Sequence, residues 1–343
     1  MKITAKEILG NENYPAISYG GYRTRDRYKV PTINQIKEDL QILYAAGFRV
    51  LRTFEAHTSI AKNLLQAIKE LDIEMYVMLG AWINAKDANT VNVNHDDEDY
   101  DFNKYQIDEC VRLANQYNDI VKMIAVGNES MAHFAVNYYT SSDVILKWVN
   151  HLQQLKNEDK LDKDLYVTSS DDYTSWNNCN KDLLKAVDFI SMHVYPFHYI
   201  SNDSTYSDIE KSIEYVKEQY FKIKELTDTP IHIGETGWAT KDNYLHKEVA
   251  NEINQKMYYE KIKKLSNELS ISCFYFSAFD EPWKQLSHAD GFQNHYGLFT
   301  FDGRAKFALW KMVDENKFKK LGRGIFCSEV TKTFNGKLEW LSN

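Results

Sequence analysis

The sequence contains little cysteine and little proline. Only four of its 343 residues are cysteine and five are proline. The cysteines stand far apart in the chain without a CxxC pair, which argues against a zinc ribbon and against a fold built on disulfides. No linker rich in proline, glycine or serine divides the chain, so we expect a single domain.

Clusters of positive charge and long apolar runs are also absent. The chain has 41 Lys and Arg residues against 49 Asp and Glu residues, which gives a net charge of −8. We expect no nucleic-acid partner, because neutralising phosphates needs clustered Lys and Arg. We also expect no membrane span, because no apolar run approaches the roughly 18 residues that one requires.

Short β-rich runs alternate with longer amphipathic stretches along the chain. Such alternation predicts a parallel sheet with right-handed crossovers, and eight βα units predict a closed barrel. We therefore expect an α/β fold, a single (β/α)8 TIM barrel with extended βα loops over residues 1–314. Residues 315–343 are expected to form a short C-terminal tail packed on the barrel. The predicted strands are Ala16–Tyr19, Phe48–Thr53, Glu74–Leu79, Val121–Val126, Leu165–Ser169, Phe189–His193, Ile231–Gly234 and Ser272–Ser277.

The amphipathic stretches have apolar residues at three- and four-residue spacing, which predicts helices. Thr32 is a predicted N-cap, and the acidic segment Asn92–Asp101 is expected to be a solvated loop. A doubly wound open sheet is the alternative fold, but Tyr19–Tyr22 (YGGY) lacks the GxGxxG turn that such a sheet would need. The predicted helices are Thr32–Ala46, Ser59–Leu71, Tyr105–Tyr117, Ser142–Lys156, Lys181–Ala186, Ser207–Leu226, Leu245–Leu269 and Ala305–Asp314.

Polar and aromatic residues gather just past the predicted strands. In a closed barrel the C-terminal ends of the strands form one rim, where barrel enzymes place their catalytic groups. No nicotinamide, flavin or phosphate signature accompanies them, so we expect no cofactor. The residues are Tyr19, Tyr22, Arg52, Glu55, Trp82, Asn84, Asn128, Glu129, Asp171, Asp172, Tyr173, Trp176, His193, Tyr195, Glu235, Trp238, Asp280, Glu281, Trp283 and Lys284.

A rim of carboxylates, amides and aromatic rings suits a sugar polymer, because aromatic planes pack on the apolar faces of pyranose rings. Glycoside hydrolysis needs one carboxylic acid to protonate the leaving oxygen and a second carboxylate to attack the anomeric carbon or activate water. Glu129 and Glu235 follow the fourth and seventh predicted strands and would face each other across the barrel mouth. They are the candidate catalytic pair.

Each of these features also has a purely structural interpretation. A single Glu at a strand end is more often an ion-pair partner, and tryptophans there often pack in the core. Arg52 is expected to pair with a carboxylate, which would hold Glu235 ionised by lowering its pKa. No metal site is expected, because His193 and His198 lack HExxH-type spacing with an acid.

Three segments together resemble the signature motifs of glycoside hydrolase family 17, in the order of that family. They are Val126-Gly127-Asn128-Glu129, Gly234-Glu235-Thr236-Gly237-Trp238 and Phe279-Asp280-Glu281-Pro282-Trp283-Lys284. Further similarity lies in Val194-Tyr195-Pro196-Phe197, Tyr296-Gly297-Leu298-Phe299, Tyr19-Gly20 and Arg52-Thr53-Phe54. The resemblance covers nearly the whole chain and implies a retaining β-1,3-glucanase on a (β/α)8 barrel.

The resemblance also implies roles for single residues. Glu129 resembles the general acid/base and Glu235 the nucleophile, while Asn128 would bond the 2-hydroxyl of the sugar being cleaved. Glu281 and Lys284 match cleft residues that support the acid/base. The other candidate substrate-binding residues are Tyr19, Arg52, Glu55, Trp82, Asp172, Tyr195, Trp238 and Phe279, of which Tyr195 and Trp238 would flank the bound sugar.

Departures from the plant members of the family point to a bacterial-type relative. Ala239 stands where plant members usually have Pro, and Asp171-Asp172-Tyr173 has no obvious plant counterpart. The long loop after the third strand has none either. The shape of the cleft is therefore not carried over from plants, and endo-action and exo-action both stay open.

The expected reaction is hydrolysis of β-1,3-glucosidic bonds in a laminarin-like glucan by double displacement. Retention of configuration needs the two carboxyl groups about 5 to 5.5 Å apart. The expected partner is a β-glucan polysaccharide or oligosaccharide, bound by a monomer. Three alternatives stay open, namely a β-1,3-glucan transglycosylase, a mixed-linkage β-1,3-1,4-glucanase and a non-catalytic glucan-binding protein.

The start of the sequence bears on where such an enzyme would act. The first ten residues lack the apolar core of a signal peptide. A glucan polymer does not readily cross membranes. We therefore expect a secreted, periplasmic or cell-surface enzyme whose signal segment is absent from this sequence.

Overall fold

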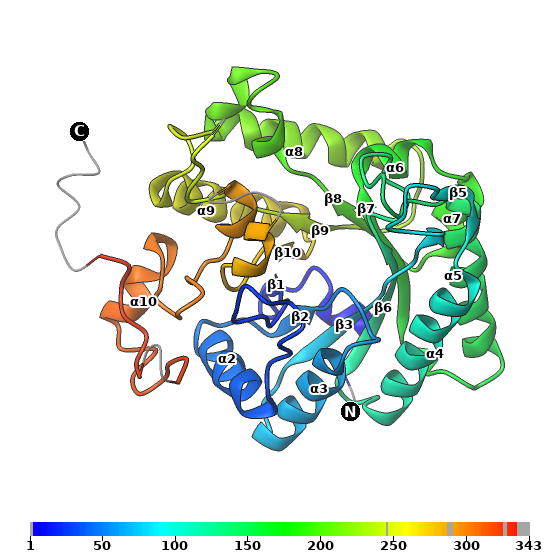
Figure 1. Ribbon diagram of the computed structural model, residues 1–343, viewed down its shortest axis with the longest axis horizontal. Helices are drawn as coiled ribbons and strands as arrows, with labels where there is room; N and C mark the ends of the chain where they lie inside the picture. Colours follow the sequence, from blue (N-terminus) through cyan, green and yellow to red (C-terminus); the bar gives the residue numbers. More distant parts are fainter. Residues whose placement is uncertain (1–2, 245, 287–290, 325–327, 335–343) are drawn as a thin grey trace.

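Eight parallel strands close into a barrel in the computed structural model, which describes residues 3–244, 246–286, 291–324 and 328–334 (Figure 1). The barrel closes where β1 pairs with both β2 and β10. Each predicted strand overlaps one barrel strand, so the predicted fold is confirmed. The strands are β1 (Ala16–Ser18), β2 (Val50–Arg52), β3 (Tyr76–Ala81), β6 (Val121–Asn128), β7 (Tyr166–Asp172), β8 (Ile190–His193), β9 (Ile231–Thr236) and β10 (Cys273–Tyr275).

Helices follow the strands and lie around the outside of the barrel (Figure 1). Thr32 caps α2 as predicted, with the reciprocal hydrogen bonds to Gln35 of a capping box. Within the described ranges, no helix has the length and apolar character to cross a membrane. The helices are α2 (Ile33–Ala45), α3 (Ser59–Leu71), α4 (Tyr100–Gln116), α5 (Ser142–Asn157), α6 (Tyr173–Asn178), α7 (Lys181–Ala186), α8 (Ile209–Lys224), α9 (Glu252–Leu269) and α10 (Trp310–Asp314). Short 3-10 turns are η1 (Pro196–Tyr199), η2 (Ser204–Ser207), η3 (Pro282–Leu286), η4 (Phe292–Asn294) and η5 (Phe307–Leu309).

Three predicted helices begin elsewhere than expected. Helix α10 begins at Trp310, five residues after the predicted start at Ala305, and the 3-10 turn η5 precedes it. The last long helix, α9, begins at Glu252, because the Asn251 side chain accepts the N–H of Asn254 and caps it there. Its predicted start, Leu245, lies outside the described residues. Helix α4 begins at Tyr100, five residues early, because the Asp99 side chain caps it.

The acidic segment after β3 is solvent-exposed for the most part, as its charge suggested, but it is not an irregular loop. Its residues form β5 (Asn94–Glu98), which pairs antiparallel with β4 (Ala85–Lys86). The strand was not expected because individual partners here outweigh the low strand propensity of acidic residues. Glu98 accepts a hydrogen bond from the Trp148 indole at 2.7 Å and forms an ion pair with Lys147.

The N-terminal end of the barrel interior is filled by apolar side chains. Inward-facing residues of β1, β2, β3, β6 and β10, and Phe189 just before β8, pack together with Ala5 and Ile8 of the short helix α1 (Ala5–Ile8). Helix α1 therefore closes this end. The inward positions nearer the other end are polar, as with Arg52 two residues beyond Val50 on β2. Only the C-terminal mouth of the barrel is left for a binding site.

Candidate active site

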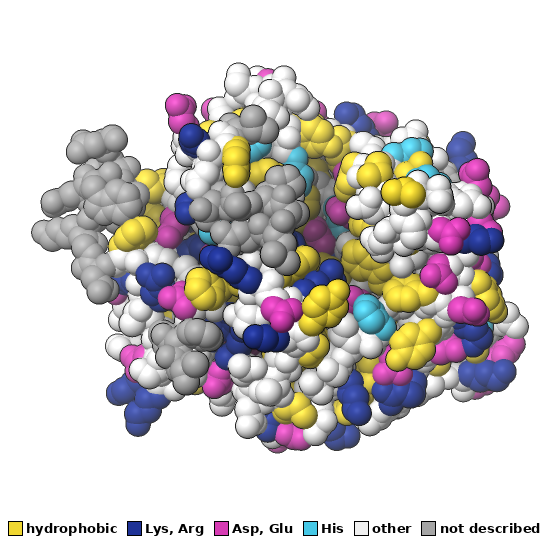
Figure 2. Space-filling view, in the orientation of Figure 1, with side chains coloured by type: hydrophobic (Ala, Val, Ile, Leu, Met, Phe, Trp, Pro, Cys, Tyr) yellow, Lys and Arg dark blue, Asp and Glu magenta, His cyan; other side chains and the backbone are white. Residues whose placement is uncertain are grey.

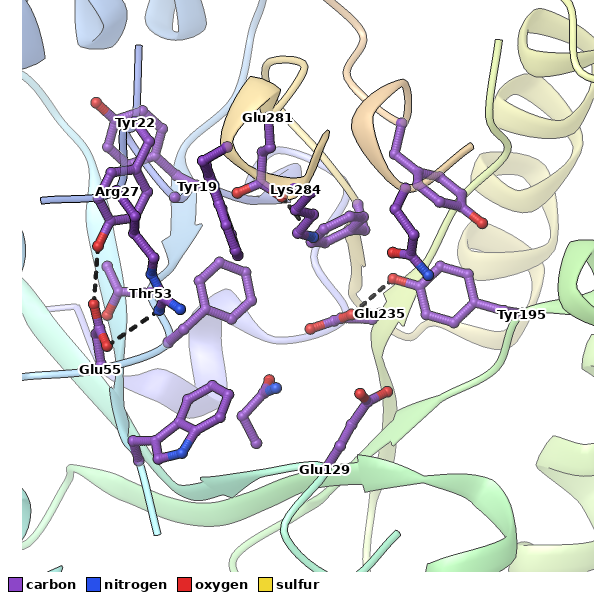
Figure 3. A pocket seen from close by; sticks show the side chains of 18 of the residues that line it. Tyr19, Tyr22, Arg27, Thr53, Glu55, Glu129, Tyr195, Glu235, Glu281 and Lys284 are labelled. Atoms are coloured by element: carbon purple, nitrogen blue, oxygen red, sulfur yellow. Dashed lines mark hydrogen bonds and ion pairs between the residues drawn. The ribbon is translucent and has the colours of Figure 1, made fainter. Parts of the chain in front are cut away.

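A cleft of about 450 Å³ opens at the C-terminal ends of the barrel strands. Figure 2 shows hydrophobic and acidic side chains around a hollow near the middle of this face, and Figure 3 shows the residues inside it. The volume lies in the range of small-molecule and substrate sites. The predicted site residues that line the cleft are Tyr19, Glu55, Trp82, Asn128, Glu129, Asp172, Tyr195, Glu235, Glu281 and Lys284.

Glu129 stands in the turn that ends β6. Its backbone is left-handed, with φ of 50°, and its N–H donates to the Ser170 carbonyl at 2.9 Å. Gly127, two residues earlier, has φ of 83°, and a Cβ there would lie 2.9 Å from Ser130 Oγ. Glycine at this position permits the tight turn, and such backbone strain is often found at functional sites. The turn directs Glu129 into the cleft, where its side chain is 23% exposed.

Glu235 lies near the end of β9, deeper in the cleft than Glu129. A Cβ at the preceding residue, Gly234, would lie 2.1 Å from Ser191 Oγ, so glycine is needed for β8 and β9 to approach. The Glu235 carboxylate forms an ion pair with Arg52 and accepts the Tyr195 hydroxyl at 2.7 Å. Its side chain is only 8% exposed. Glu235 is thus a buried carboxylate whose oxygens both have partners.

His193 lies between the two glutamates. Its Nδ1 is 3.2 Å from a Glu129 oxygen, and its Nε2 is 3.8 Å from a Glu235 oxygen. One ligand atom from each of the three residues lies within 4.8 Å of the other two. One oxygen of Glu129 therefore lies within 4.8 Å of an oxygen of Glu235. This close approach fits the ~5 to 5.5 Å carboxyl separation of retaining glycosidases better than the ~6.5 to 9.5 Å of inverting ones.

The surroundings of Glu235 favour its charged form. Burial alone would raise its pKa, but electrostatic interactions with His193 and Arg52 and the hydrogen bonds from Arg52 and Tyr195 lower the pKa of Glu235 to about 2. Burial and the charge of Glu235 raise the pKa of Tyr195 well above its ordinary value. This phenol therefore stays protonated and donates a hydrogen bond to Glu235. Glu235 is therefore ionised at any pH near neutral.

Arg52 also connects Glu235 to Asn128. Its second nitrogen donates to the Asn128 side-chain oxygen at 2.5 Å. The Asn128 oxygen is thereby engaged, and the NH₂ group of this amide is the part that a ligand in the cleft would meet. Arg52 itself is 1% exposed and does not line the cleft, contrary to its predicted role in substrate binding. It acts on the site through the two side chains that it holds.

The amino-acid sequence matches the model of one protein family. A family model described as the BtgE/BtgC glycoside hydrolase domain matches residues 16–297. The chain belongs to this glycoside hydrolase family. The match runs from β1 to the loops beyond β10 and thus includes Glu129 and Glu235.

Solved structures and curated relatives agree with this family. The crystal structure of an endo-laminarinase from Formosa Hel1_33_131 is 41% identical, with a TM-score of 0.94 over 99% of this chain and 96% of that one. A glucan 1,3-beta-glucosidase of Schizosaccharomyces pombe is 25% identical and covers 79% of both chains. A putative glucan endo-1,3-beta-glucosidase, btgC, of Aspergillus niger is 24% identical over 85% of this chain. The chain spans only 43% of the length of that relative.

Two further predicted residues of this glycoside hydrolase domain do not line the cleft. Trp238 is fully buried and packs against Phe197 and Tyr258, so the prediction that it flanks a bound sugar was wrong. The chain turns after β9 and directs this side chain back toward α9, where its indole N–H donates to the Val249 carbonyl at 2.9 Å. Phe279 is 5% exposed and lies under the Arg323 guanidinium, 3.8 Å from the ring centroid.

Several cleft residues were missed, most of them because they lie in loops beyond the strand ends; Phe276 was counted within a predicted strand. Among them, His198 stacks on Tyr195 with ring centroids 4.8 Å apart, and its Nε2 is 2.9 Å from the Tyr296 hydroxyl. Burial lowers the pKa of His198 to about 4, so it is neutral. The available signal was the high aromatic content of these loops. The missed residues are Arg27, Phe134, Tyr138, His198, Tyr199, Phe276 and Gln293.

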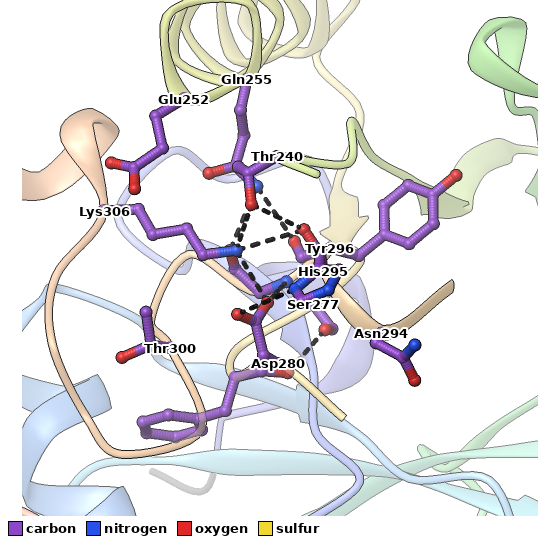
Figure 4. Close-up of polar contacts among 12 residues, drawn as sticks. Thr240, Glu252, Gln255, Ser277, Asp280, Asn294, His295, Tyr296, Thr300 and Lys306 are labelled. Atoms are coloured by element: carbon purple, nitrogen blue, oxygen red, sulfur yellow. Dashed lines mark hydrogen bonds and ion pairs between the residues drawn. The ribbon is translucent and has the colours of Figure 1, made fainter. Parts of the chain in front are cut away.

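A buried polar network supports the loops on the β9 and β10 side (Figure 4). Lys306 is 2% exposed and donates to Asp280 and Thr240, both at 2.7 Å, and to the His295 carbonyl at 3.1 Å. Asp280 directly precedes Glu281, which forms a 2.7 Å ion pair with Lys284 in the cleft. The network thus fixes the backbone from which Glu281 enters the cleft.

The arrangement suits two-carboxylate chemistry better than metal binding. Glu129, His193 and Glu235 form the one group of three His, Cys, Asp or Glu residues in the described part of the chain whose ligand atoms are close enough to hold an ion. A cation there would have to compete with the Arg52 guanidinium, which is already paired with Glu235. An ionised carboxylate beside a second carboxyl group is what glycoside hydrolysis requires.

Proposed function

We propose that this chain is a retaining β-1,3-glucanase that hydrolyses laminarin-type glucans. The observation that carries the proposal is the close approach of Glu129 and Glu235 at the bottom of an aromatic-lined cleft. The 41% identity to an endo-laminarinase over almost the full length of both chains supports the same substrate class.

The reaction follows from the different surroundings of the two carboxyl groups. Glu235, held ionised by Arg52, attacks the anomeric carbon and forms a glycosyl-enzyme. Glu129, the more exposed of the two, gives its proton to the departing glycosidic oxygen. After that product leaves, Glu129 takes a proton from water, and the resulting hydroxide releases the sugar from Glu235. The two displacements retain the anomeric configuration.

The remaining cleft residues fit a glucosyl unit. The Asn128 amide lies beside Glu129, where it would donate to the 2-hydroxyl of the sugar being cleaved, a contact that strengthens in the transition state. Trp82 packs against Tyr138 with ring centroids 4.9 Å apart and offers an aromatic surface at the cleft wall. The Glu281–Lys284 pair supplies charged donors and acceptors for sugar hydroxyls.

The polymeric substrate also bears on location and assembly. A glucan chain meets the enzyme outside the cytoplasmic membrane, so we propose a secreted, periplasmic or cell-surface location. The residues that line the cleft come from strand ends and loops of one chain, so we propose that the enzyme acts as a monomer.

Azide rescue tests the two roles. Glu129 and Glu235 are each replaced by alanine, and the variants are incubated with an activated aryl β-glucoside and azide. Without its nucleophile, Glu235→Ala should let azide attack directly and give the inverted α-glycosyl azide. Glu129→Ala still forms the glycosyl-enzyme and should give the retained β-glycosyl azide. As a control, Glu281→Ala should give no glycosyl azide, although its carboxylate lies in the same cleft.

Other outcomes separate the alternatives. An α-glycosyl azide from Glu129→Ala would mean that Glu129 is the nucleophile and Glu235 the acid/base. Products of the parent chain that are longer than the input oligosaccharide would identify a transglycosylase. Faster release of reducing sugar from lichenan than from laminarin would identify a mixed-linkage glucanase. Tight laminarin binding without turnover would show that the chain only binds glucan.

A further inference from the structure

Arg27 connects three loops at one end of the cleft. It lies in the loop after β1, and its guanidinium forms a 3.4 Å ion pair with Glu55, which follows β2. The same guanidinium carbon is 4.6 Å from the ring centroid of Trp283, which follows β10. Tyr22 completes the group, because its hydroxyl donates to Glu55 at 3.1 Å and its ring meets Trp283 edge-on at 5.8 Å.

This group lies on the glycone side of the reacting bond. Figure 3 shows Arg27 and Glu55 to the left of Glu235, Tyr195 to its right and Glu129 below it, away from Arg27. The acid must face the departing oxygen, so the leaving part of the glucan occupies the Glu129 side. The sugars on the non-reducing side of the cleaved bond therefore extend toward Arg27.

The contacts of Arg27 are those of a side chain that can move. It is 43% exposed, and its ion pair is long and partly in solvent, where such pairs contribute little. Its planar guanidinium nevertheless lies over Trp283, and the face of a tryptophan ring is also the surface against which a pyranose ring packs. A sugar and Arg27 cannot occupy that face together.

We propose that Arg27 is a gate on the glycone end of the cleft, and that by covering Trp283 it limits how many glucosyl units bind on that side. The inference rests on the proposed β-1,3-glucanase activity and assigns a specificity-determining residue to it. With Arg27 in place, the enzyme releases short oligosaccharides of narrow size range. With the guanidinium removed, Trp283 becomes an additional glucosyl subsite.

The test maps the bond that is cleaved in laminariheptaose labelled at its reducing end, because the length of the unlabelled product counts the glucosyl units bound on the glycone side. Arg27→Ala should shift cleavage toward a longer unlabelled product, with the ratio of longer to shorter product rising about two- to five-fold, the scale of an exposed ion pair. Arg27→Lys keeps a charge for Glu55 but lacks the planar fork and should shift cleavage in the same direction.

Two further variants make the test specific. Arg25 is an exposed arginine of the same loop that does not line the cleft, and Arg25→Ala should cleave like the parent chain. The double variant Arg27→Ala/Trp283→Ala should show no shift toward longer unlabelled products, because it lacks the Trp283 ring that Arg27→Ala uncovers.

An unchanged cleavage pattern in Arg27→Ala would overturn the gate. So would a shift toward shorter unlabelled products, because Arg27 would then be a residue that binds sugar itself. If the parent chain cleaves no laminari-oligosaccharide, the proposed function fails and the gate fails with it. If the parent chain cleaves and the variants match it, only the gate fails.

Discussion

Arg52 is the residue on which the charge of Glu235 depends. Replacing it with methionine removes the guanidinium from a carboxylate whose side chain is 8% exposed. The pKa of Glu235 should then rise from about 2. Activity needs ionised Glu235 and is lost as pH falls through this pKa, so the acidic limb of kcat/KM should move to higher pH. We also expect kcat to fall by roughly 100-fold or more, as for the loss of one preorganised electrostatic group.

Tyr195→Phe is the matched control for Arg52→Met. It removes one neutral hydrogen bond to the same carboxylate and leaves the charges in place. The acidic limb should therefore move in the same direction by less. An acidic limb that stays fixed in Arg52→Met would contradict the role given to Arg52. Both variants are measured as pH profiles on a soluble aryl glucoside.

Asp171 should make stability depend on pH. Burial, and to a lesser degree the charge of Glu129, raises the pKa of Asp171 from 3.8 to about 7 despite hydrogen bonds from Met131 and Ser175. A folded pKa above the unfolded value means that stability is fully present below pH 4 and is lost as pH rises through about 7. The free energy of unfolding in urea should therefore be lower at pH 8 than at pH 5. Asp171→Asn should flatten this difference, and an equal slope in the variant would contradict the assignment.

Single residues were predictable where a strand delivers them directly to the barrel mouth. Glu129 and Glu235 were found because each stands at the end of a buried run, where β9 brings Glu235 into the cleft and the turn that ends β6 brings Glu129 there. Trp238 was misplaced because its direction depends on a turn after β9, which residue pattern does not specify. Arg27 was missed because it reaches the cleft from the middle of a loop.

At the scale of elements, the Lys306 network joins loops that come from different strands. Lys306→Met would leave Asp280 buried at 7% exposure without its ammonium partner. Breaking a buried pair in this way should lower the free energy of unfolding by about 3 to 5 kcal/mol. KM for laminarin should rise as well, because Glu281 enters the cleft from the next position in the chain. Urea unfolding and steady-state kinetics check both effects.

Lys311 provides the control for this element. It lies in α10 near Lys306 in sequence, but its side chain is 88% exposed and its ion pair with Glu315 is long, at 3.8 Å. Lys311→Met should change the free energy of unfolding by no more than about 0.5 kcal/mol. Equal effects of the two substitutions would mean that burial of the Lys306 pair is not what stabilises the loops.

Elements with a strong hydrophobic period were predictable, whereas elements held by particular partners were not. Helix α3 (Ser59–Leu71) was predicted to the residue, because apolar side chains recur along one face. Strand β5 was not predicted, because its acidic residues are held by partners such as Trp148 and Lys86. Those partners come from other parts of the chain and leave no local pattern.

For the whole molecule, the two ends of the barrel differ in chemistry. One end is filled by methionine and phenylalanine side chains and closed by α1, while the other carries buried charges around Glu235. The apolar end can supply stability without constraint from catalysis. The polar end can then hold strained and charged groups that would be unfavourable on their own. This separation follows from the change from apolar to polar residues along the inward positions of the strands, as from Val50 to Arg52 on β2.

The described residues beyond 314, which are 315–324 and 328–334, join the barrel through Arg323, and we propose that they are integral to the catalytic domain. Arg323 and Asp39 of α2 are both fully buried and form a two-pronged ion pair at 2.7 Å, and Asp39 also accepts the hydroxyl of Tyr19, which lines the cleft. Arg323→Met should lower the free energy of unfolding by about 3 to 5 kcal/mol, because a buried carboxylate loses a partner. KM should rise too, since Tyr19 loses its fixed acceptor.

A double-mutant cycle with Asp39→Asn tests whether these effects share one cause. If the pair is the link, the combined variant should be less destabilised than the sum of the single variants by about 1 kcal/mol or more. Additive effects on stability, or an unchanged KM in Arg323→Met, would mean that this part of the chain covers the barrel without positioning its cleft. Arg23 keeps one 2.7 Å contact with Asp39 in the Arg323→Met variant. Asp39 should therefore keep part of its charge pairing. The KM of Arg323→Met should be higher than that of the parent chain and lower than that of the double variant Tyr19→Phe/Arg323→Met.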